Sequence, residues 1–432
     1  MISKKKVYVG LAADILHEGH INILKTANKL GEVTVGLLTD KAISTYKQLP
    51  HLNYKQRLMV LKSVKYVKKI VQQETLDYTE NLKKLKPDFL VHGDDWKKGV
   101  QKTTRTKAIK TLKTWGGKLI EPKYTKNISS SLIKKKLTEI GTTPDIRRAK
   151  LKRLIFAKGI VKLLESHNAL TGTIIEKIKI RKKNQLLEFD GMWSSSLTDS
   201  ATRGKPDNQA VDFSTRINGL NEIFEVTTKP LIFDADNGGR NEHVSFTVRT
   251  LERLGVSGIC IEDKIGIKRN SLFKNQSESY QDSIKNFSKK IKIAKNSKIT
   301  DDFFIIARIE SFILGKSLKD ALKRANAYSK AGADAILIHS KEKNPNQIFR
   351  FAKVFKKSKF YKPMIAVPST YSKTYEKELI RNGFKVVIYA NQLLRAAYPQ
   401  MVKTAEQILK SGRAYDAEKS ISPINEVLNL IK

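Results

Sequence analysis

Two short apolar runs flank one helical stretch in residues 229–263, which read "KPLIFDADNGGRNEHVSFTVRTLERLGVSGICIED". Each run ends in carboxylates, Asp234 and Asp236 after the first and Glu262 after the second. The stretch between them, "HVSFTVRTLERLG", has the apolar spacing of one helix face and ends in glycine. A strand, a helix and a second strand in this order predict two parallel strands joined by a crossover helix, with acidic side chains at the same end of both strands.

Apolar runs with polar ends recur through the rest of the C-terminal part of the chain. They read "HNALTG", "FDGMWSSS", "FFIIARIE", "DAILIHS", "PMIAVPS" and "KVVIYAN", and most of the stretches between them carry helical signals. With the two runs above they make eight units in roughly 270 residues, as a (β/α)8 TIM barrel requires. We therefore predict an α/β fold with such a barrel over residues 156–432. A doubly wound sheet is the alternative, but it would not need eight polar strand ends that face one point.

Polar residues stand at the predicted carboxyl ends of these strands, where barrels of this kind place their chemistry. They are Trp193 to Ser196, Asp234, Asp236, Glu262, Asp263, Arg308, Glu310, His339 and Asn391. Asp234 and Asp236 are two residues apart, so on a strand both side chains point the same way. Together with Glu262 they form a cluster of hard oxygen ligands suited to Mg²⁺. Solvated strand caps that form salt bridges are the plainer alternative.

Cations and a polar loop complete this end of the predicted barrel. Arg308 presents a fork of donors that matches phosphoryl or carboxylate oxygens, and His339 follows the apolar run "DAILI". Lys268, Asn270 and Ser271 lie in the segment "KIGIKRNS" that follows the second run quoted above. This segment predicts a loop that closes over an anionic substrate and excludes water, although Lys-Arg-Asn-Ser is also common in exposed turns.

The N-terminal part of the chain has its own pattern of predicted strands and helices. From residue 5, the apolar runs "KVYVGLAA", "EVTVGLLT", "KKIVQQ" and "PDFLVHG" alternate with helical stretches, which predicts a Rossmann-like parallel sheet over residues 1–140. A linker is predicted at 141–155, where Gly, Thr and Pro precede a basic amphipathic stretch. The motif "HEGH" places His17 and His20 at the start of the first helix. A helix N-terminus attracts anions, and two histidines there can donate to a phosphate whose charge grows during nucleotidyl transfer.

Composition narrows the classes of partner and compartment. The 432 residues are enough for two or three domains, and the formal net charge of +40 comes mostly from lysines spread along the whole chain. A basic nucleic-acid-binding scaffold is a rival interpretation, but we expect no nucleic-acid partner because no basic stripe carries interleaved aromatic residues. The single cysteine, Cys260, excludes an intrachain disulfide framework and a cysteine-based zinc site and fits a cytoplasmic protein. Asp14 interrupts the N-terminal apolar run, and no apolar stretch reaches 18 residues, so we expect neither a secretion signal nor a membrane span.

Several motifs make the C-terminal part recognisable. The segments "FDGMWSSSLTDS", "KPDN", "IFDADNGG", "IEDKIGIKRNSLF", "IIARIES", "ILIHSKEK" and "VIYANQLLRAAYP" occur in this order, and residues from about 155 to 432 resemble the phosphoenolpyruvate mutase family of the isocitrate lyase superfamily. By this resemblance Mg²⁺ is held by Asp234, Asp236 and Glu262. The substrate carboxylate is framed by Trp193, Ser195, Ser196 and Leu197. The catalytic residues are Asp207, Lys268, Asn270, Ser271, Arg308 and His339.

The resemblance also implies a reaction, in which the phosphoryl group of phosphoenolpyruvate moves from the enol oxygen to C3 and gives phosphonopyruvate. Lyases of the superfamily carry a catalytic cysteine in a Lys-Lys-Cys-Gly-His motif on the loop that here reads "EDKIGIKRNS", which argues against a carboxylic-acid lyase. A phosphonopyruvate hydrolase shares much of this scaffold, and Asn270 favours the mutase. The family further implies a homo-oligomer, a dimer or a tetramer, and coupling to a phosphonopyruvate decarboxylase or aminotransferase, because family mutases work against an unfavourable equilibrium.

The N-terminal part resembles a second family. The motifs "HEGH", "VHGDDW" and "ISSS", in this order over residues 5 to about 137, resemble cytidylyltransferases that act on glycerol phosphate and related alcohol phosphates. The resemblance implies CTP as the nucleotide with Mg²⁺, and a phosphonate or alcohol phosphate as the acceptor. Its transition-state residues are His17 and His20. Its nucleotide-binding residues are Asp14, Gly19, Lys47, Arg57, Asp94, Trp96, Ser129 and Ser130. The sequence departs from this family at one place, because the family's Arg-Thr before the last motif is Tyr124-Thr125 here. Class I aminoacyl-tRNA synthetases are an alternative, since they share the His-x-Gly-His motif. They also have a Lys-Met-Ser-Lys-like loop, which this sequence lacks. Together the two parts predict a bifunctional enzyme of phosphonate biosynthesis.

Overall fold

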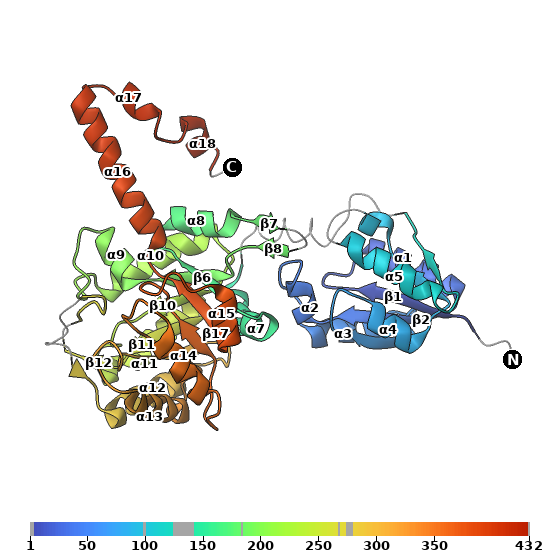
Figure 1. Cartoon of the computed structure of the whole chain (residues 1–432), viewed down its shortest axis with the longest axis horizontal. Coiled ribbons are helices and arrows are strands. Elements are labelled where there is room, and N and C mark those ends of the chain that lie inside the picture. Colours follow the sequence, from blue (N-terminus) through green and yellow to red (C-terminus); the bar gives the residue numbers. More distant parts are fainter. Residues whose placement is uncertain are drawn as a thin grey trace.

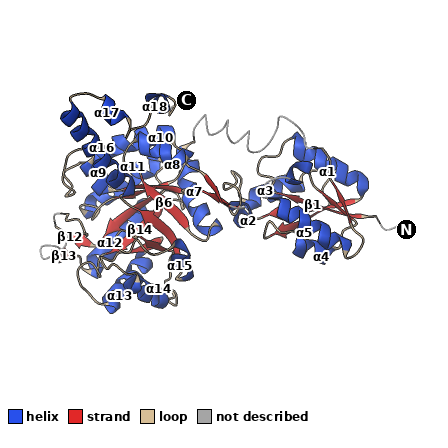
Figure 2. Ribbon diagram, turned by 45° about the horizontal axis from the view of Figure 1, so that its top comes forward, coloured by secondary structure: helices blue, strands red, loops and turns tan. Residues whose placement is uncertain are grey.

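The computed structural model of the chain describes residues 4–97, 101–123, 142–182, 185–266, 268–273 and 280–430. Within these ranges the chain forms a five-stranded sheet near the N-terminus, a closed eight-stranded barrel beyond it and two short hairpins (Figure 1). Every strand pairing in the sheet and in the barrel is parallel, and helices cover the strands (Figure 2). The predicted α/β fold, with a Rossmann-like sheet followed by a (β/α)8 barrel, is therefore confirmed.

The N-terminal sheet has the strand order β3-β2-β1-β4-β5. Its strands are β1 (Lys6–Leu11), β2 (Glu32–Leu38), β3 (Lys69–Gln73), β4 (Phe89–Val91) and β5 (Lys118–Ile120). Its helices are α1 (Glu18–Leu30), α2 (Asp40–Ser44), α3 (Tyr54–Lys62), α4 (Thr79–Leu85), the 3₁₀ turn η1 (Asp94–Lys97) and α5 (Lys102–Lys113). The central strand β1 is buried at every position except Lys6, as expected for a strand covered on both faces.

The barrel closes in the order β10-β11-β14-β15-β16-β17-β6-β9. Its strands are β6 (Val161–Glu165), β9 (Gly191–Ser194), β10 (Leu231–Asp234), β11 (Gly258–Glu262), β14 (Phe304–Ile309), β15 (Ala335–Ile338), β16 (Met364–Ala366) and β17 (Phe384–Tyr389). Its helices are α8 (Ala169–Lys177), α9 (Ser196–Ala201), α10 (Phe213–Val226), α11 (Asn241–Leu254), α12 (Ile284–Ser297), α13 (Leu318–Ala331), α14 (Asn346–Phe355), α15 (Glu376–Arg381) and α16 (Gln392–Ser411). The hairpins pair β7 (Ile180–Lys182) with β8 (Gln185–Leu187) and β12 (Lys264–Ile265) with β13 (Tyr280–Gln281).

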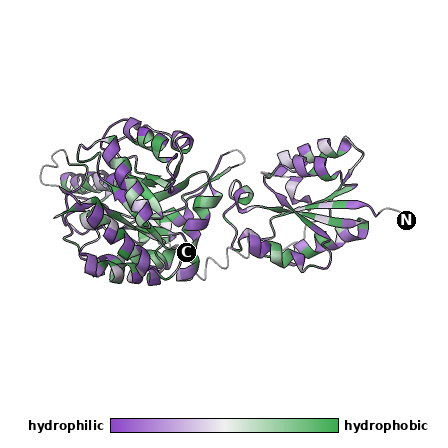
Figure 3. Ribbon diagram, turned by 90° about the horizontal axis from the view of Figure 1, so that it is seen from below, coloured by the Kyte–Doolittle hydropathy of each residue, from purple (hydrophilic) through white to green (hydrophobic). Residues whose placement is uncertain are grey.

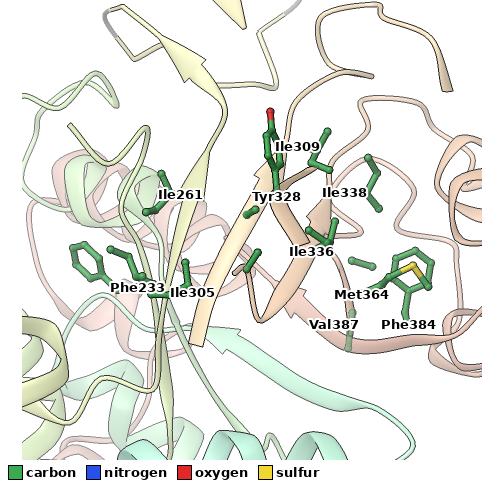
Figure 4. Packing of buried hydrophobic residues seen from close by; sticks show 14 of the residues in the cluster. Phe233, Ile261, Ile305, Ile309, Tyr328, Ile336, Ile338, Met364, Phe384 and Val387 are labelled. Carbon is green, nitrogen blue, oxygen red and sulfur yellow. The ribbon is translucent and has the colours of Figure 1, made fainter. Parts of the chain in front are cut away.

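Strand alternation divides the barrel core into two layers. In β11, Ile259 and Ile261 pack outward against the helices, whereas Cys260 packs inside the barrel. The same alternation places Phe233 and Ile305 in the outer layer, where Figure 4 shows them among the other residues of that cluster. Figure 3 shows hydrophobic residues along the strands and hydrophilic residues on the outer faces of the helices. Most inward rows continue, at the carboxyl end of the strand, into a polar side chain, as Cys260 does into Glu262, whereas those of β16 and β17 continue into Val367 and Ala390.

Helix α7 (Pro144–Ala157) closes the opposite, amino-terminal end of the barrel. Leu151, Leu154 and Ile155 are buried in the inner layer of the core. Arg147 donates from Nη2 to the carbonyls of Phe224 and Thr227, each at 3.1 Å. Most of the segment predicted as a linker, residues 141–155, therefore lies in a helix that packs under the barrel.

Helix α16 extends away from the barrel and leads to α17 (Tyr415–Glu418) and α18 (Ile424–Leu428) near the C-terminus (Figure 1). None of its residues is buried, although Tyr398, Met401 and Leu409 are among the exposed large apolar side chains. In the described part of the chain, no helix is long and apolar enough to cross a membrane.

Candidate active sites

The first site lies at the carboxyl ends of the barrel strands. A cavity of about 60 Å³ there is lined by Trp193, Ser195, Ser196, Leu197, Asp207, Asp234, Lys268, Asn270, Ser271, Leu272, Arg308, Leu337, His339, Val367, Ser369, Ala390 and Asn391. Eleven of the thirteen mutase-site residues predicted from the sequence are in this set, and the other two, Asp236 and Glu262, contact it through ion pairs. The structure therefore brings the predicted residues together from seven separate segments of sequence.

Three carboxylates define the acidic side of this cavity. Asp234 accepts from the Ser196 hydroxyl at 3.2 Å and from the Asp236 backbone N–H at 3.2 Å. Asp236 adopts a positive φ of 54°, a backbone conformation that few residues other than glycine adopt and that is often found where a site needs a fixed orientation. Glu262 is buried, and neither of its carboxylate oxygens has a hydrogen-bond partner. Burial, opposed by Arg308, raises the pKa of Glu262 to about 7.

The ammonium group of Lys268 lies between the carboxylates. It donates to Asp207 Oδ1 at 2.9 Å and also contacts Asp236 Oδ1 and the Ser196 hydroxyl. Burial disfavours this charge, but Asp236, Asp234 and Asp207 outweigh it and hold the pKa of Lys268 above its usual value. Lys268 thus places a positive charge where three aspartates stabilise it.

The acidic residues fit a divalent cation in their chemistry. Among the described residues, no three His, Cys, Asp or Glu side chains converge as a metal site, and the Lys268 ammonium group contacts Asp236 where an ion would have to bind. Glu262 nevertheless keeps two buried oxygens without hydrogen-bond partners, and a buried carboxylate without hydrogen bonds is costly even beside the charge of Arg308. Asp234 and Asp236 lie at the tip of the neighbouring strand and offer the hard oxygen ligands that Mg²⁺ prefers.

The cationic side of the cavity is built around Arg308. Its Nη2 lies 3.3 Å from Glu262 Oε2, and its Nε donates to Glu310 Oε1 at 2.6 Å. Burial disfavours the charge of Arg308, but Glu310 and Glu262 raise its pKa well above its usual value. His339 follows β15 and places Nδ1 3.0 Å from Glu310 Oε1, and burial together with Arg308 lowers the pKa of His339. A guanidinium and an imidazole therefore stand together opposite the acidic side.

The loop of residues 268–273 covers the cavity. Asn270 Nδ2 donates to Asp207 Oδ2 at 2.7 Å, and Ser271 Oγ donates to Glu310 Oε2 at 2.5 Å. The loop is anchored where it leaves the barrel, because Lys264 Nζ donates to the Arg269 carbonyl at 2.6 Å. Its polar side chains thus face the strand ends instead of solvent, as the sequence predicted.

Arg216 has a supporting position that we did not predict from the sequence. Its Nε donates to Asp199 Oδ2 at 2.9 Å and its Nη1 donates to the Asp234 carbonyl at 2.6 Å. The guanidinium also lies 3.9 Å from Asp236 Oδ2 and 4.0 Å from the ring centroid of Phe233. Arg216 lies within helix α10, where an arginine normally faces solvent, so the sequence contains no local signal for this role.

Asp263 is the second acidic residue of the "IED" strand end, and it faces away from the cavity. Its Oδ1 accepts from the Glu310 backbone N–H at 2.9 Å. Its Oδ2 accepts from Gln281, Arg324 and Tyr328 at 2.9, 3.2 and 2.8 Å. The two neighbouring carboxylates therefore point in different directions. Glu262 faces the site, and Asp263 holds the roots of the loop that covers the cavity.

The second site lies in the N-terminal domain, at the carboxyl ends of its central strands. A cavity of about 450 Å³ is lined by Val9, Gly10, Leu11, Ala12, His17, Gly19, His20, Asn22, Ile23, Thr26, Leu38, Tyr46, Lys47, Tyr78, His92, Gly93, Asp95, Gln101, Pro122 and Lys123. The predicted residues His17, Gly19, His20 and Lys47 are in this set. Both histidines and Gly19 stand at the start of α1, where the helix N-terminus favours an anion.

The two histidines are arranged as a pair. Their ring centroids are 4.0 Å apart, and His17 Nδ1 accepts from the Gly19 backbone N–H at 3.2 Å. Neutral His17 therefore carries its ring hydrogen on Nε2, where it can be donated to a ligand. His20 Nδ1 is buried without a hydrogen-bond partner, and burial, assisted by His17 and Lys47, lowers its pKa to about 4.

Four predicted nucleotide-binding residues lie outside the lining of this cavity. Asp14 Oδ1 accepts from the Leu52 N–H, and Arg57 is fully buried in contacts to Asp40, Ala12 and Leu52. Trp96 donates to Glu121 at 2.7 Å, and Asp94 packs beside it in η1. Ser129 and Ser130 lie outside the described residues. The roles of these six residues in nucleotide binding remain predictions.

His92 lines the same cavity, and we did not single it out in the sequence. Its ring stacks on Trp96 at 3.9 Å with an interplanar angle of 7°, and its Nδ1 donates to the Gly93 carbonyl at 2.8 Å. Its position at the end of the run "PDFLVHG" was the available signal, because strand ends in this sheet point into the site.

Comparison with known proteins divides the chain in the same way. Residues 151–409 match the family model of phosphoenolpyruvate phosphomutase, and residues 8–136 match a cytidylyltransferase-like model. The chain is 34% identical to phosphoenolpyruvate phosphomutase from Tetrahymena pyriformis, over 66% of this chain and 91% of that protein. It is similar to the crystal structure of phosphoenolpyruvate phosphomutase from Streptomyces platensis subsp. rosaceus, with a TM-score of 0.60 and 34% identity, over 66% of this chain and 94% of that one. It is also similar to phosphonopyruvate hydrolase in complex with oxalate and Mg²⁺, with a TM-score of 0.57 and 29% identity, over 67% of this chain and 95% of that one.

Proposed function

The chain belongs to the phosphoenolpyruvate phosphomutase family, carries a cytidylyltransferase-like domain and is an enzyme, and on this premise we propose that its barrel interconverts phosphoenolpyruvate and phosphonopyruvate. The observation that carries the proposal is the meeting of Lys268, Asn270 and Ser271 with the strand-end residues of the barrel. An anion between Arg308 and the acidic side would be enclosed by this loop on the remaining side.

The reaction needs a phosphoryl group to move within one trapped molecule. The bond from phosphorus to the enol oxygen breaks and a bond from phosphorus to C3 forms, so neither water nor a proton is consumed. Arg308 and His339 hold the phosphoryl oxygens, and Asn270 contacts them from the loop. Trp193 and the backbone at Ser195 frame the carboxylate.

We further propose that Mg²⁺ is held by Asp234, Asp236 and Glu262, with Asp207 beside the bound substrate. The ion would supply charge neutralisation for the pyruvate enolate that forms when phosphorus leaves its oxygen. The closed loop keeps the site dry, and this matters because water that reached the phosphoryl group would hydrolyse it. The hydrolase relative shows that a similar barrel supports that outcome, and Asn270 is the residue that favours the mutase.

Phosphorus NMR of the full chain with phosphonopyruvate and Mg²⁺ tests this proposal. We expect the phosphoenolpyruvate signal to grow at the expense of phosphonopyruvate. Inorganic phosphate with pyruvate as the only products would favour the hydrolase, and the carboxylic-acid lyase would require turnover of a carbon acid such as methylisocitrate. Because family mutases lie toward phosphoenolpyruvate at equilibrium, we propose that a decarboxylase or an aminotransferase consumes phosphonopyruvate in the cytoplasm.

We propose that the N-terminal domain transfers a cytidylyl group from CTP, with Mg²⁺, to a phosphonate or an alcohol phosphate. His17 and His20 stand where they can donate to the α-phosphate, and the cavity of about 450 Å³ is of the size of small-molecule sites. A screen of nucleotides and acceptors that follows pyrophosphate release tests it. Release with CTP alone among the nucleotides would support the assignment, whereas tight and steeply salt-dependent RNA binding without release would favour a nucleic-acid scaffold.

We also propose that the chain forms a homo-oligomer, a dimer or a tetramer, and that the barrel unit begins at α7. Helix α16 exposes Tyr398, Met401 and Leu409, and an apolar face of this length on a barrel helix is typical of an interface. Light scattering coupled to size exclusion measures the state. A monomer at micromolar concentration would contradict the proposal.

A further inference from the structure

The carboxylate of Glu310 lies at the meeting point of the cationic side and the loop. It is fully buried on the strand end after β14. Oε1 accepts from Arg308 Nε at 2.6 Å and from His339 Nδ1 at 3.0 Å, and Oε2 accepts from Ser271 Oγ at 2.5 Å. Three donors from three separate segments of sequence therefore converge on one side chain.

The charge of Glu310 is well supported. Burial alone would favour the protonated acid, but Arg308 and His339 hold its pKa well below the usual range. Lys264 Nζ lies 3.9 Å from Oε2 and adds a further positive charge. As a carboxylate, Glu310 can only accept hydrogen bonds, so its bond to His339 needs the ring hydrogen on Nδ1, an atom that also lies 3.0 Å from Arg308 Nη2.

The contact with the loop makes this carboxylate more than a local partner of Arg308. Ser271 Oγ donates to Glu310 and accepts from Arg308 Nη2 at 3.0 Å. When the 268–273 loop moves away, both hydrogen bonds are lost together. The orientation of the arginine is therefore linked to the position of the loop through one hydroxyl group.

The backbone of the same residue reaches the roots of the loop. Glu310 N–H donates to Asp263 Oδ1 at 2.9 Å, and Asp263 Oδ2 accepts from Gln281 at the far end of the β12–β13 hairpin. One residue thus contacts the tip of the loop through its side chain and the anchor of the loop through its backbone.

We propose that Glu310 is a positioning residue that holds Arg308 and His339 in the orientation that receives the phosphoryl group, and that it couples this orientation to closure of the 268–273 loop through Ser271. The inference rests on the proposed mutase function. Glu310 is not among the residues that line the cavity, so its effect on the reaction passes through its three donors.

The test compares Glu310→Gln, Glu310→Asp and Ser271→Ala with a matched control, Asp320→Asn. Asp320 is also a carboxylate that accepts from a serine hydroxyl, at 2.7 Å, and from an arginine Nε, at 2.9 Å, but it lies on α13 outside the site. Phosphorus NMR gives kcat, KM and the fraction of phosphonopyruvate that ends as inorganic phosphate. Circular dichroism establishes that each variant is folded.

We expect Glu310→Gln to lower kcat about 100-fold while KM changes less than about threefold, because an amide cannot accept from all three donors. The hydrolysed fraction should rise in both Glu310→Gln and Ser271→Ala, and Glu310→Asp should recover part of kcat. Asp320→Asn should stay within about twofold of the wild type. A folded Glu310→Gln variant with the wild-type kcat and the wild-type product ratio would overturn the proposal.

Limited trypsin cleavage after Arg269 follows the loop without turnover, with oxalate and Mg²⁺ as the closing ligand. We expect protection in the wild type and in Asp320→Asn, and reduced protection in Glu310→Gln and Ser271→Ala. Equal protection in all four proteins would overturn the coupling. A wild type that makes no phosphoenolpyruvate would instead contradict the proposed function, and the cleavage pattern would still decide the role of Glu310.

Discussion

Replacing Lys268 with methionine tests whether its ammonium group competes with a divalent cation for the same carboxylates. The side chain is 5% exposed, and Nζ donates to Asp207 and Asp236. Methionine keeps the length and the apolar stem of the side chain but removes its charge. We expect the metal-free variant to be less stable than the wild type and to bind Mg²⁺ more tightly.

The distances set the size of the effect. A unit charge 2.9 Å from a carboxylate interacts with it by about 6 kcal/mol at an effective dielectric constant of about 20. Removing the ammonium group from water offsets several kcal/mol of this attraction, so that a net of about 1–3 kcal/mol remains for the metal-free protein. Since Mg²⁺ has to displace the ammonium group, its Kd in the Lys268→Met variant should fall by a factor of about ten to one hundred.

Isothermal titration calorimetry with MgCl₂ measures this Kd, and Lys268→Arg serves as the matched control because it keeps the positive charge. The arginine variant should bind Mg²⁺ about as weakly as the wild type. Thermal unfolding in EDTA reports the loss of stability, which added Mg²⁺ should restore. An unchanged or weaker affinity in a folded Lys268→Met protein would refute the competition between the ammonium group and the cation.

Three further predictions concern the two sites. Asp234→Ala should abolish mutase turnover and calorimetric Mg²⁺ binding together, and activity in the folded variant would show the metal assignment to be wrong. His17→Ala should slow pyrophosphate release from CTP by about 100-fold and leave mutase turnover unchanged, because the histidine lies in the other domain. The pKa of His20, about 4, lies below its ordinary value of 6.5. Between these values the unfolded chain takes up a proton that the folded chain does not, so the free energy of unfolding decreases as the pH is lowered. His20→Asn should remove about 2 kcal/mol of the difference in unfolding free energy between pH 7.5 and pH 5, measured by urea titration.

Strand periodicity is the reason that the strand-end residues could be predicted to gather at one opening of the barrel. An inward-facing row such as Ile306 and Arg308, or Leu337 and His339, follows directly from the two-residue repeat of a strand. Once the sequence predicts a closed barrel, every inward row ends at the same opening. The polar residue at the end of each row is therefore expected at the site without any knowledge of distances.

Helices and loops offer no comparable rule, and Arg216, which we did not predict, lies on a helix. Arg216 reaches the acidic side from α10 through its bond to the Asp234 carbonyl, and this approach is a property of tertiary packing. Glu310 was visible as a strand end, but its three donors come from segments whose approach depends on the closed loop. In the N-terminal domain, Arg57 and Trp96 were predicted as nucleotide-binding residues, yet their donors are engaged by the Ala12 carbonyl and by Glu121.

The adjacent pair Glu262 and Asp263 separates the proposed ion site from the root of the loop that covers it. Neighbouring residues on a strand point to opposite faces, so one carboxylate enters the cavity and the other enters the outer layer. Asp263 accepts four hydrogen bonds there and is fully buried, which makes the start of the loop rigid. Glu262 has no hydrogen bond and can exchange the Arg308 contact for a cation. Because this root is rigid, we expect Lys268 to leave the carboxylates without disturbing them, through movement of residues beyond the β12–β13 pairing alone.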